Sequence, residues 1–177
     1  MTANNIYESS GANIFNNSQK YTSATPWVLT GTSGDIIATT DMYCQVTPGA
    51  TYYFTCKTSS SWADGHGYND SRKGKATIWL YLLRTYNASN NGFDSPICFT
   101  SSNMIANGVW KYTIPSDMNM ARVRYNTYSN GTDSVTCKFW DTFLIPEKYY
   151  VPENFQSNTP SLHIGKDFIS GREVYEF

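Results

Sequence analysis

The segment ATIWLYLLRTY, residues 76–86, has apolar or aromatic side chains at nearly every position. The segment divides into two faces at a period of two, which is the side-chain repeat of a β-strand. The aliphatic set, predicted to face a core, is Ala76, Ile78, Leu80 and Leu82, and the opposite set is Thr77, Trp79, Tyr81, Leu83 and Thr85. We therefore predict a strand that carries two aromatic side chains on the face turned away from the core.

Other segments alternate in the same way. Residues 41–46 and 51–56 flank the turn signal Thr47-Pro48-Gly49-Ala50 and are predicted to form a hairpin, with Tyr52, Phe54 and Cys56 inward and Tyr53, Thr55 and Lys57 outward. In residues 121–128 the inward set is Ala121, Val123 and Tyr125, and the outward set is Arg122, Arg124, Asn126 and Tyr128. In residues 135–140 the inward set is Val135, Cys137 and Phe139, and the outward set is Lys138 and Trp140. If these strands share one sheet, its outer face combines Trp79, Tyr81, Arg122, Arg124 and Tyr53.

The fold class follows from what interrupts these segments. No sustained apolar stripe of helical period is present, and Gly, Pro, Asn and Ser recur along the chain. We predict an all-β fold, a β-sandwich of two antiparallel sheets, over residues 1–150. Residues 151–177 are predicted to be a linker and C-terminal tail, a short appendage too small to fold alone and a candidate for oligomerisation or docking.

A long segment without periodicity, residues 58–74, carries isolated Trp62, His66 and Tyr68. Long loops that bear aromatic side chains often hold binding sites on a rigid scaffold. Two interpretations stay open here, a mobile lid over a ligand and an ordinary solvated loop.

Composition and charge remove several function classes. The net charge is −1 and charged residues make up 15%, so we expect neither nucleic-acid binding nor attraction to a membrane surface. The four cysteines form no CxxC pair and no metal-ligand spacing with His, so we expect no zinc site and buried reduced thiols at Cys56 and Cys137. The N-terminus lacks the pattern of a signal peptide, and no apolar stretch reaches the ~20 residues of a membrane span.

Candidate catalytic groups are scattered. A glycosidase needs two carboxyl groups that face each other, whereas Asp35, Asp64, Asp94, Asp117 and Asp133 lie in predicted turns. No local motif activates a Cys/His pair. We expect no enzyme.

The order of several short motifs resembles the carbohydrate-binding-module type of jelly-roll sandwich. The motifs are residues 13–18 with 26–29, residues 46–54, residues 110–112 and residues 139–146. The resemblance covers roughly residues 13–150 and implies a jelly-roll fold that binds glycans. It also implies a structural calcium ion held partly by an Asp in the closing strand. Residues 16–20, Asn-Asn-Ser-Gln-Lys, lack the second acidic ligand of that group, so Asp141 is the one ligand we nominate.

The C-terminal sequence, residues 164–177, resembles the chain ends of tail and baseplate proteins from phages and prophages of Gram-positive bacteria. Such virion proteins are made in the host cytoplasm, which agrees with free cysteines and with the missing signal peptide. The resemblance implies a virion (phage tail) or extracellular location, with other virion proteins and further copies of the chain as partners.

Together these patterns predict a non-catalytic carbohydrate-binding module that recognises host cell-surface polysaccharide. Aromatic platforms and planar donors are the groups that a glycan site needs. The predicted ligand-binding residues are Trp79, Tyr81, Arg122, Arg124, Tyr53, Tyr128, Trp62 and Tyr68. Two alternatives stay open: a structural virion module that packs its aromatic face on a neighbouring subunit, and the accessory module of a polysaccharide-degrading enzyme.

Overall fold

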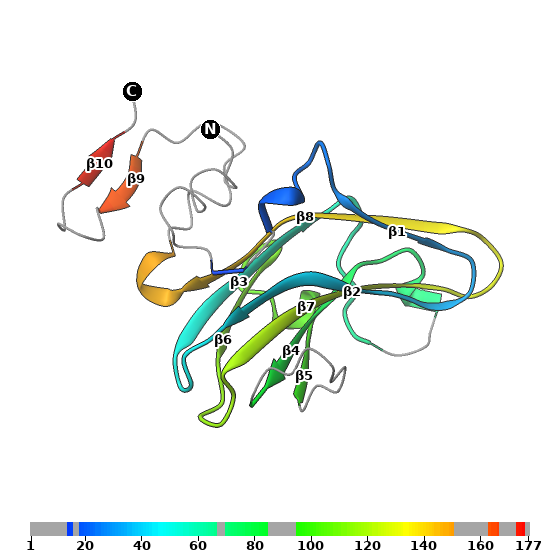
Figure 1. The fold of residues 1–177 in the computed structure, drawn as a ribbon. Coiled ribbons are helices and arrows are strands. Elements are labelled where there is room, and N and C mark those ends of the chain that lie inside the picture. Colours follow the sequence, from blue (N-terminus) through cyan, green and yellow to red (C-terminus); the bar gives the residue numbers. More distant parts are fainter. Residues whose placement is uncertain are drawn as a thin grey trace.

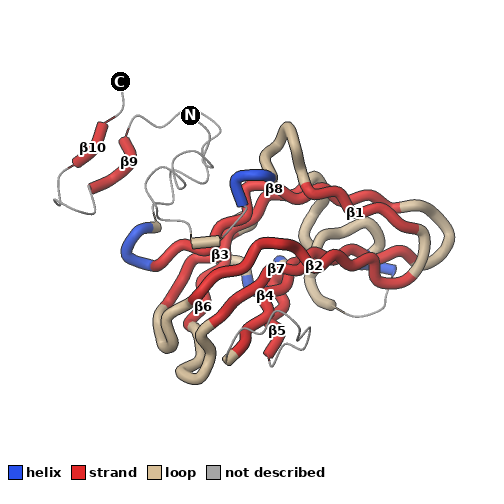
Figure 2. The backbone as a smooth tube through the Cα atoms, viewed as in Figure 1, coloured by secondary structure: helices blue, strands red, loops and turns tan. Residues whose placement is uncertain are grey.

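Eight strands of the described chain form a sandwich of two four-stranded sheets (Figure 1). The computed structural model describes residues 14–15, 18–66, 70–84, 95–150, 163–166 and 173–175. The strands are β1 (Trp27–Gly31), β2 (Gly34–Gln45), β3 (Thr51–Thr58), β4 (Thr77–Leu83), β5 (Ser95–Phe99), β6 (Val109–Thr113), β7 (Met120–Ser129), β8 (Val135–Pro146), β9 (His163–Lys166) and β10 (Glu173–Tyr175). Short 3-10 helices lie at η1 (Ser18–Lys20), η2 (Asp70–Arg72), η3 (Ser101–Asn103) and η4 (Glu147–Tyr149) (Figure 2).

The strand order identifies the fold as a jelly roll. One sheet has the order β1-β8-β3-β6, the other has the order β2-β7-β4-β5, and all of these pairs are antiparallel. From β1 to β8 the chain therefore changes sheet at each connection except the one between β4 and β5. Eight antiparallel strands wound in this way between two sheets make a jelly-roll β-sandwich. The predicted fold class is confirmed.

The predicted hairpin between residues 41–46 and 51–56 is wrong. Both segments are strands, but β2 and β3 belong to different sheets. The turn itself is present, because the Ala50 N–H donates to the Thr47 carbonyl at 3.1 Å and Gly49 adopts a φ of 76°. A tight turn reverses the chain, yet it does not fix which strand becomes the hydrogen-bonded neighbour, and here it carries the chain from one sheet to the other.

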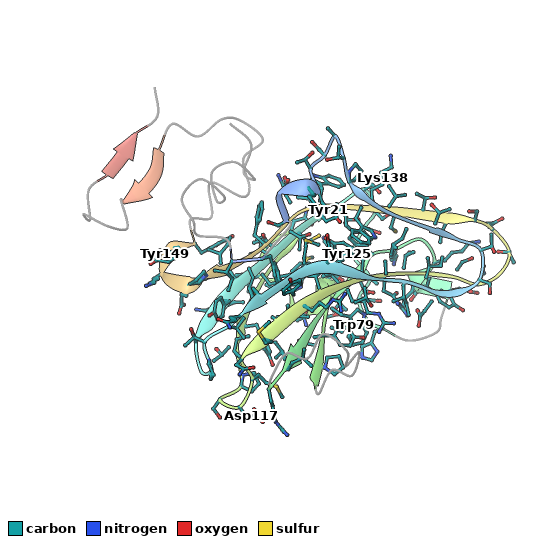
Figure 3. The ribbon with its side chains drawn as sticks, in the orientation of Figure 1. Tyr21, Trp79, Asp117, Tyr125, Lys138 and Tyr149 are labelled. Carbon is teal, nitrogen blue, oxygen red and sulfur yellow. The ribbon has the colours of Figure 1, made fainter. Side chains whose placement is uncertain are left out.

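The core lies between the two sheets, where the predicted inward faces meet. Ile78, Leu80 and Leu82 of β4 are fully buried, as the period-two pattern predicted. Tyr125 of β7 stacks on Phe139 of β8, with ring centroids 4.3 Å apart and 12° between the planes, and so ties one sheet to the other. Figure 3 shows Tyr125 toward the interior and Trp79 on the outer side of its sheet.

Three polar side chains predicted to face solvent are buried instead. Thr77 and Asn126, opposite each other on β4 and β7, and Thr55 on β3 have almost no exposed surface. The Asn126 Oδ1 accepts hydrogen bonds from Arg72 Nη2 at 2.9 Å and from Thr77 Oγ1 at 3.3 Å. The segment around η2 therefore packs on one end of the outer face, which a strand pattern alone does not reveal.

All four cysteines are free thiols, and Cys44, Cys56 and Cys137 are buried, as predicted for the last two. The tail contributes an antiparallel pair, β9 with β10, as a two-stranded sheet of its own. Residues 151–162 lie outside the described residues, so the division of the chain near residue 150 stays a prediction. No helix in the described part of the chain is long and apolar enough to cross a membrane.

Candidate functional site

The candidate site is the outer face of the β2-β7-β4-β5 sheet, defined here by Trp79, Tyr81, Arg122 and Arg124. In the β4–β7 register Trp79 lies opposite Arg124, and Tyr81 lies opposite Arg122. All four side chains are partly exposed. The structure therefore brings these four predicted residues together on one sheet face, on two neighbouring strands.

The rings and guanidinium groups of the outer face contact each other. The centroids of Trp79 and Tyr81 are 6.3 Å apart, with 37° between their planes. The Arg124 Nη1 donates a hydrogen bond to the Tyr81 hydroxyl, and the Arg124 guanidinium lies 5.4 Å from the Tyr81 ring centroid. The Arg122 Nε donates to the Thr40 carbonyl at 2.8 Å. The two hydrogen bonds orient the Arg122 and Arg124 side chains on the outer face.

Arg124 differs from other arginines of this protein in its electrostatic surroundings. Arg72 pairs with Asp35 at 3.4 Å, and Arg84 pairs with Asp117 at 3.1 Å. Arg124 has no ion pair with a carboxylate among the residues that the structure describes. Its charge is stabilised instead by the hydroxyl and ring of Tyr81, so the outer face is able to accept an anionic group.

The neighbours of these residues across the sheet were not among the predicted site residues. In the register, Thr39 of β2 lies opposite Arg124, and Cys98 of β5 lies opposite Trp79. The exposed His66, which precedes η2, places its ring 5.3 Å from the Trp79 ring in an edge-on contact. No sequence signal points to Thr39 or Cys98, because a strand pattern gives the face of a residue and not its partner on the next strand.

Two of the other predicted ligand-binding residues, Tyr53 and Tyr128, lie away from these four side chains. Tyr53 is on β3 in the other sheet, where its ring stacks on Tyr150 with centroids 3.9 Å apart, so its predicted place beside Trp79 is wrong. Tyr128 faces the same side as Arg124 but lies at the far end of β7, 5.7 Å from the Arg72 guanidinium. Tyr68 lies outside the described residues.

Trp62 is not part of a mobile lid. Its side chain is 8% exposed, and its ring packs edge-on against Trp110 with centroids 4.8 Å apart. The backbone around Trp62 pairs with Ala76, because the Ala63 N–H donates to the Ala76 carbonyl and the Ala76 N–H donates to the Ser61 carbonyl, each at 2.9 Å. The large apolar area of a tryptophan favours burial wherever the chain passes close to the core.

Asp141, nominated as a calcium ligand, is engaged by an ammonium group. Its carboxylate Oδ2 lies 3.3 Å from Lys57 Nζ, and burial raises the pKa of the carboxyl although Lys57 opposes that shift. No cluster of three or more His, Cys, Asp or Glu side chains that suits a metal ion occurs in the described ranges. Calcium prefers an all-oxygen ligand set, and its binding at Asp141 stays a prediction.

The Cys98 thiol lies beside Trp79 in the register but is a poor nucleophile. Burial raises the pKa of the Cys98 thiol to about 12, although the charge of Arg72 opposes the shift. A thiol with such a pKa is almost entirely protonated at neutral pH, and the thiolate is the reactive form. What the outer face offers is aromatic surface, hydroxyl groups and guanidinium donors.

Comparisons with known proteins add little to this geometry. No protein-family model matches the sequence, and the search of curated proteins finds no match. Among solved structures the chain is similar to one described as the crystal structure of infectious bursal disease virus VP2 subviral particle, with 11% sequence identity and a TM-score of 0.32. The match covers 73% of this chain and 35% of that one, and a TM-score of this size carries no functional argument. The strand order itself therefore assigns the chain to the jelly-roll β-sandwiches.

Proposed function

We propose that this protein is a non-catalytic carbohydrate-binding module of a phage or prophage tail, which recognises cell-surface polysaccharide of the host. The observation that carries the proposal is the outer face, where Trp79 and Tyr81 lie beside Arg122 and Arg124 on one partly exposed sheet surface.

The chemistry of this face suits a sugar. A pyranose ring has apolar C–H groups on its faces and hydroxyl groups around its rim, so it binds to an aromatic ring that is flanked by hydrogen-bond donors and acceptors. Trp79 supplies the larger ring. The Tyr81 hydroxyl and the Arg124 guanidinium lie within hydrogen-bonding reach of each other and supply polar groups beside it.

A binding role suits these side chains better than a hydrolytic one. Glycoside hydrolysis in most enzyme families uses a pair of carboxyl groups that flank the scissile bond. On β2, Asp35 carries a carboxyl group on this side of the sheet, opposite Tyr128. Its carboxylate pairs with Arg72. The side chains at the centre of the face are rings and cations.

The location on a virion is supported by the resemblance of residues 164–177 to the ends of phage tail and baseplate proteins. Several copies on one particle would multiply weak individual sugar contacts into stable adsorption. The mechanism is therefore adsorption without chemistry on the glycan.

The test is binding of the purified full chain to an array of glycans and bacterial cell-wall polysaccharides. The variant Trp79→Ala with Tyr81→Ala should lose binding, because the stacking surface is removed. The matched control is Trp140→Ala, since Trp140 is also partly exposed but lies on β8 in the other sheet. Equal binding by the parent and the double variant would place the site elsewhere and contradict the proposal.

The composition of the outer face also suits a second function, the structural module of a virion. Aromatic side chains and Arg are enriched at protein interfaces, and the rings of Trp79 and Tyr81 are only partly exposed. This function predicts that the chain self-associates through the outer face. Sedimentation of the parent and the double variant separates the two functions, because only the structural module should lose its assembly when the rings are removed.

A further inference from the structure

Trp79 and Arg124 are directly opposed on neighbouring strands, so they present an aromatic ring and a cation side by side. Directly opposed residues on antiparallel strands have β carbons roughly 4.5–5.5 Å apart. The Arg124 guanidinium lies 5.4 Å from the Tyr81 ring centroid, and that centroid lies 6.3 Å from the centroid of Trp79. A ligand that stacks on Trp79 therefore has the Arg124 guanidinium on the neighbouring strand as its nearest cross-strand cation.

The cation at this position favours a negative partner. Arg124 is partly buried, and no carboxylate of the described residues forms an ion pair with it. A guanidinium group presents a fork of N–H donors that matches a carboxylate, and a hydrogen bond between two charged groups is about twice as strong as a neutral one. One Nη of Arg124 is engaged by the Tyr81 hydroxyl, which orients the group.

Resting on the proposed function, we propose that the ligand is an acidic polysaccharide built from hexuronate units. The pyranose ring of one unit stacks on Trp79 while the carboxylate of the same unit accepts hydrogen bonds from Arg124. Thr39, on the other side of Arg124 in the register, is exposed and offers a hydroxyl group to the rim of the sugar.

Covalent geometry distinguishes a hexuronate from other anionic glycans. Its carboxylate is bonded directly to the ring, so the oxygens lie roughly 3–4 Å from the ring centre, and a hydrogen bond adds about 2.8 Å. The sum places the guanidinium roughly 6–7 Å from the centre of the stacked ring, so the cation must belong to a near neighbour of the stacking residue, as Arg124 is to Trp79 in the register. The phosphate of a phosphodiester polymer lies further from the ring on rotatable bonds, so it fits an opposed pair of residues less well.

The test compares three ligands on the purified full chain by isothermal titration calorimetry. The ligands are oligomers of galacturonic acid, the same oligomers after chemical reduction of their carboxyl groups to alcohols, and a glycerol phosphate polymer. We expect the acid oligomer to bind about tenfold or more tightly than its reduced form, because the linkages are unchanged and the charge alone is lost.

Two arginine variants assign the preference to a residue. Arg124→Gln should abolish the preference for the acid oligomer over its reduced form. Arg84→Gln is the control, since it removes the same charge from an exposed side chain that pairs with Asp117 away from the outer face. An equal loss in both variants would mean that net charge, not Arg124, produces the preference, and would overturn the inference.

The outcomes separate this inference from the proposed function. Equal binding of the acid and reduced oligomers, lost in Trp79→Ala, would overturn the hexuronate assignment and leave glycan binding intact. Tighter binding of the glycerol phosphate polymer would also overturn it. Absence of binding to all three ligands overturns the hexuronate assignment, and absence of binding to the whole glycan array in addition overturns the proposed function.

Discussion

Replacing Gly108 by alanine should destabilise the protein far more than the same replacement at Gly49. Both glycines adopt a left-handed backbone, with φ of 69° at Gly108 and 76° at Gly49. A β carbon at Gly49 would meet no atom within 4 Å, whereas at Gly108 it would lie 2.1 Å from the carbonyl oxygen of Cys56. The pair therefore holds the backbone conformation constant and changes only the available space.

The magnitudes follow from these two terms. The left-handed conformation costs an alanine about 1–2 kcal/mol relative to glycine, and this is the whole effect expected at Gly49. At Gly108 the carbonyl of Cys56 must also move by about 1 Å to reach ordinary van der Waals contact, and overpacking of this kind costs about 1–3 kcal/mol more. The Cys56 N–H donates to the Gly108 carbonyl at 2.9 Å, so this shift also strains a hydrogen bond between β3 and the segment before β6.

The assay is urea unfolding of the parent and the two variants, followed by tryptophan fluorescence and far-ultraviolet circular dichroism. Coincident transitions and unchanged slopes would justify the comparison of free energies of unfolding. Gly108→Ala should lose about 2–5 kcal/mol and Gly49→Ala about 1–2 kcal/mol. Equal losses in the two variants would refute the argument that the approach of Cys56 to Gly108 is a close packing contact.

Further predictions concern buried charge and thiols. Burial raises the pKa of the Asp141 carboxyl, so the folded protein binds the carboxyl proton more tightly than the unfolded chain does. The protonated carboxyl therefore contributes stability below about pH 4. This stability is lost as the pH rises through the pKa of the folded state. Asp141→Asn should therefore gain stability relative to the parent as the pH rises from about 4, and thermal unfolding at several pH values measures this gain. A stability difference between variant and parent that does not change with pH would contradict the raised pKa. Replacing the buried Arg72 by Met should cost about 1–3 kcal/mol in urea unfolding, because Asp35 and the buried Asn126 Oδ1 each lose a donor; an unchanged stability would contradict a structural role for these contacts. The buried thiols should react with a thiol reagent in the native protein only after denaturant is added, because burial raises the pKa of Cys44 and Cys56; rapid labelling without denaturant would contradict their burial.

The local pattern of the chain predicted the faces of the strands well wherever one face meets the core. The aliphatic side of β4 and the inward side of β7 are buried as expected. This success has a physical cause, since the side chains of a strand alternate strictly and the hydrophobic effect favours burial of the apolar set.

The candidate site was predicted in part. Trp79 and Tyr81 were expected on an outer face with Arg122 and Arg124, and the β4–β7 register places them there. Tyr53 was expected beside them and lies in the other sheet, because a strand pattern does not pair strands. His66 was expected in a loop, but its contact with the Trp79 ring depends on how residues 59–66 fold back on the core.

The sequence by itself therefore determined the all-β class, the position of most strands and the sides of β3, β4, β7 and β8 that face the core. These properties depend on interactions between residues close together in the chain. The tertiary structure decided which strands are neighbours, that β2 and β3 belong to different sheets, and that Arg124 lies opposite Trp79. Such choices depend on contacts between distant segments, whose relative free energies arise from the packing of the whole core and are not encoded in any local pattern.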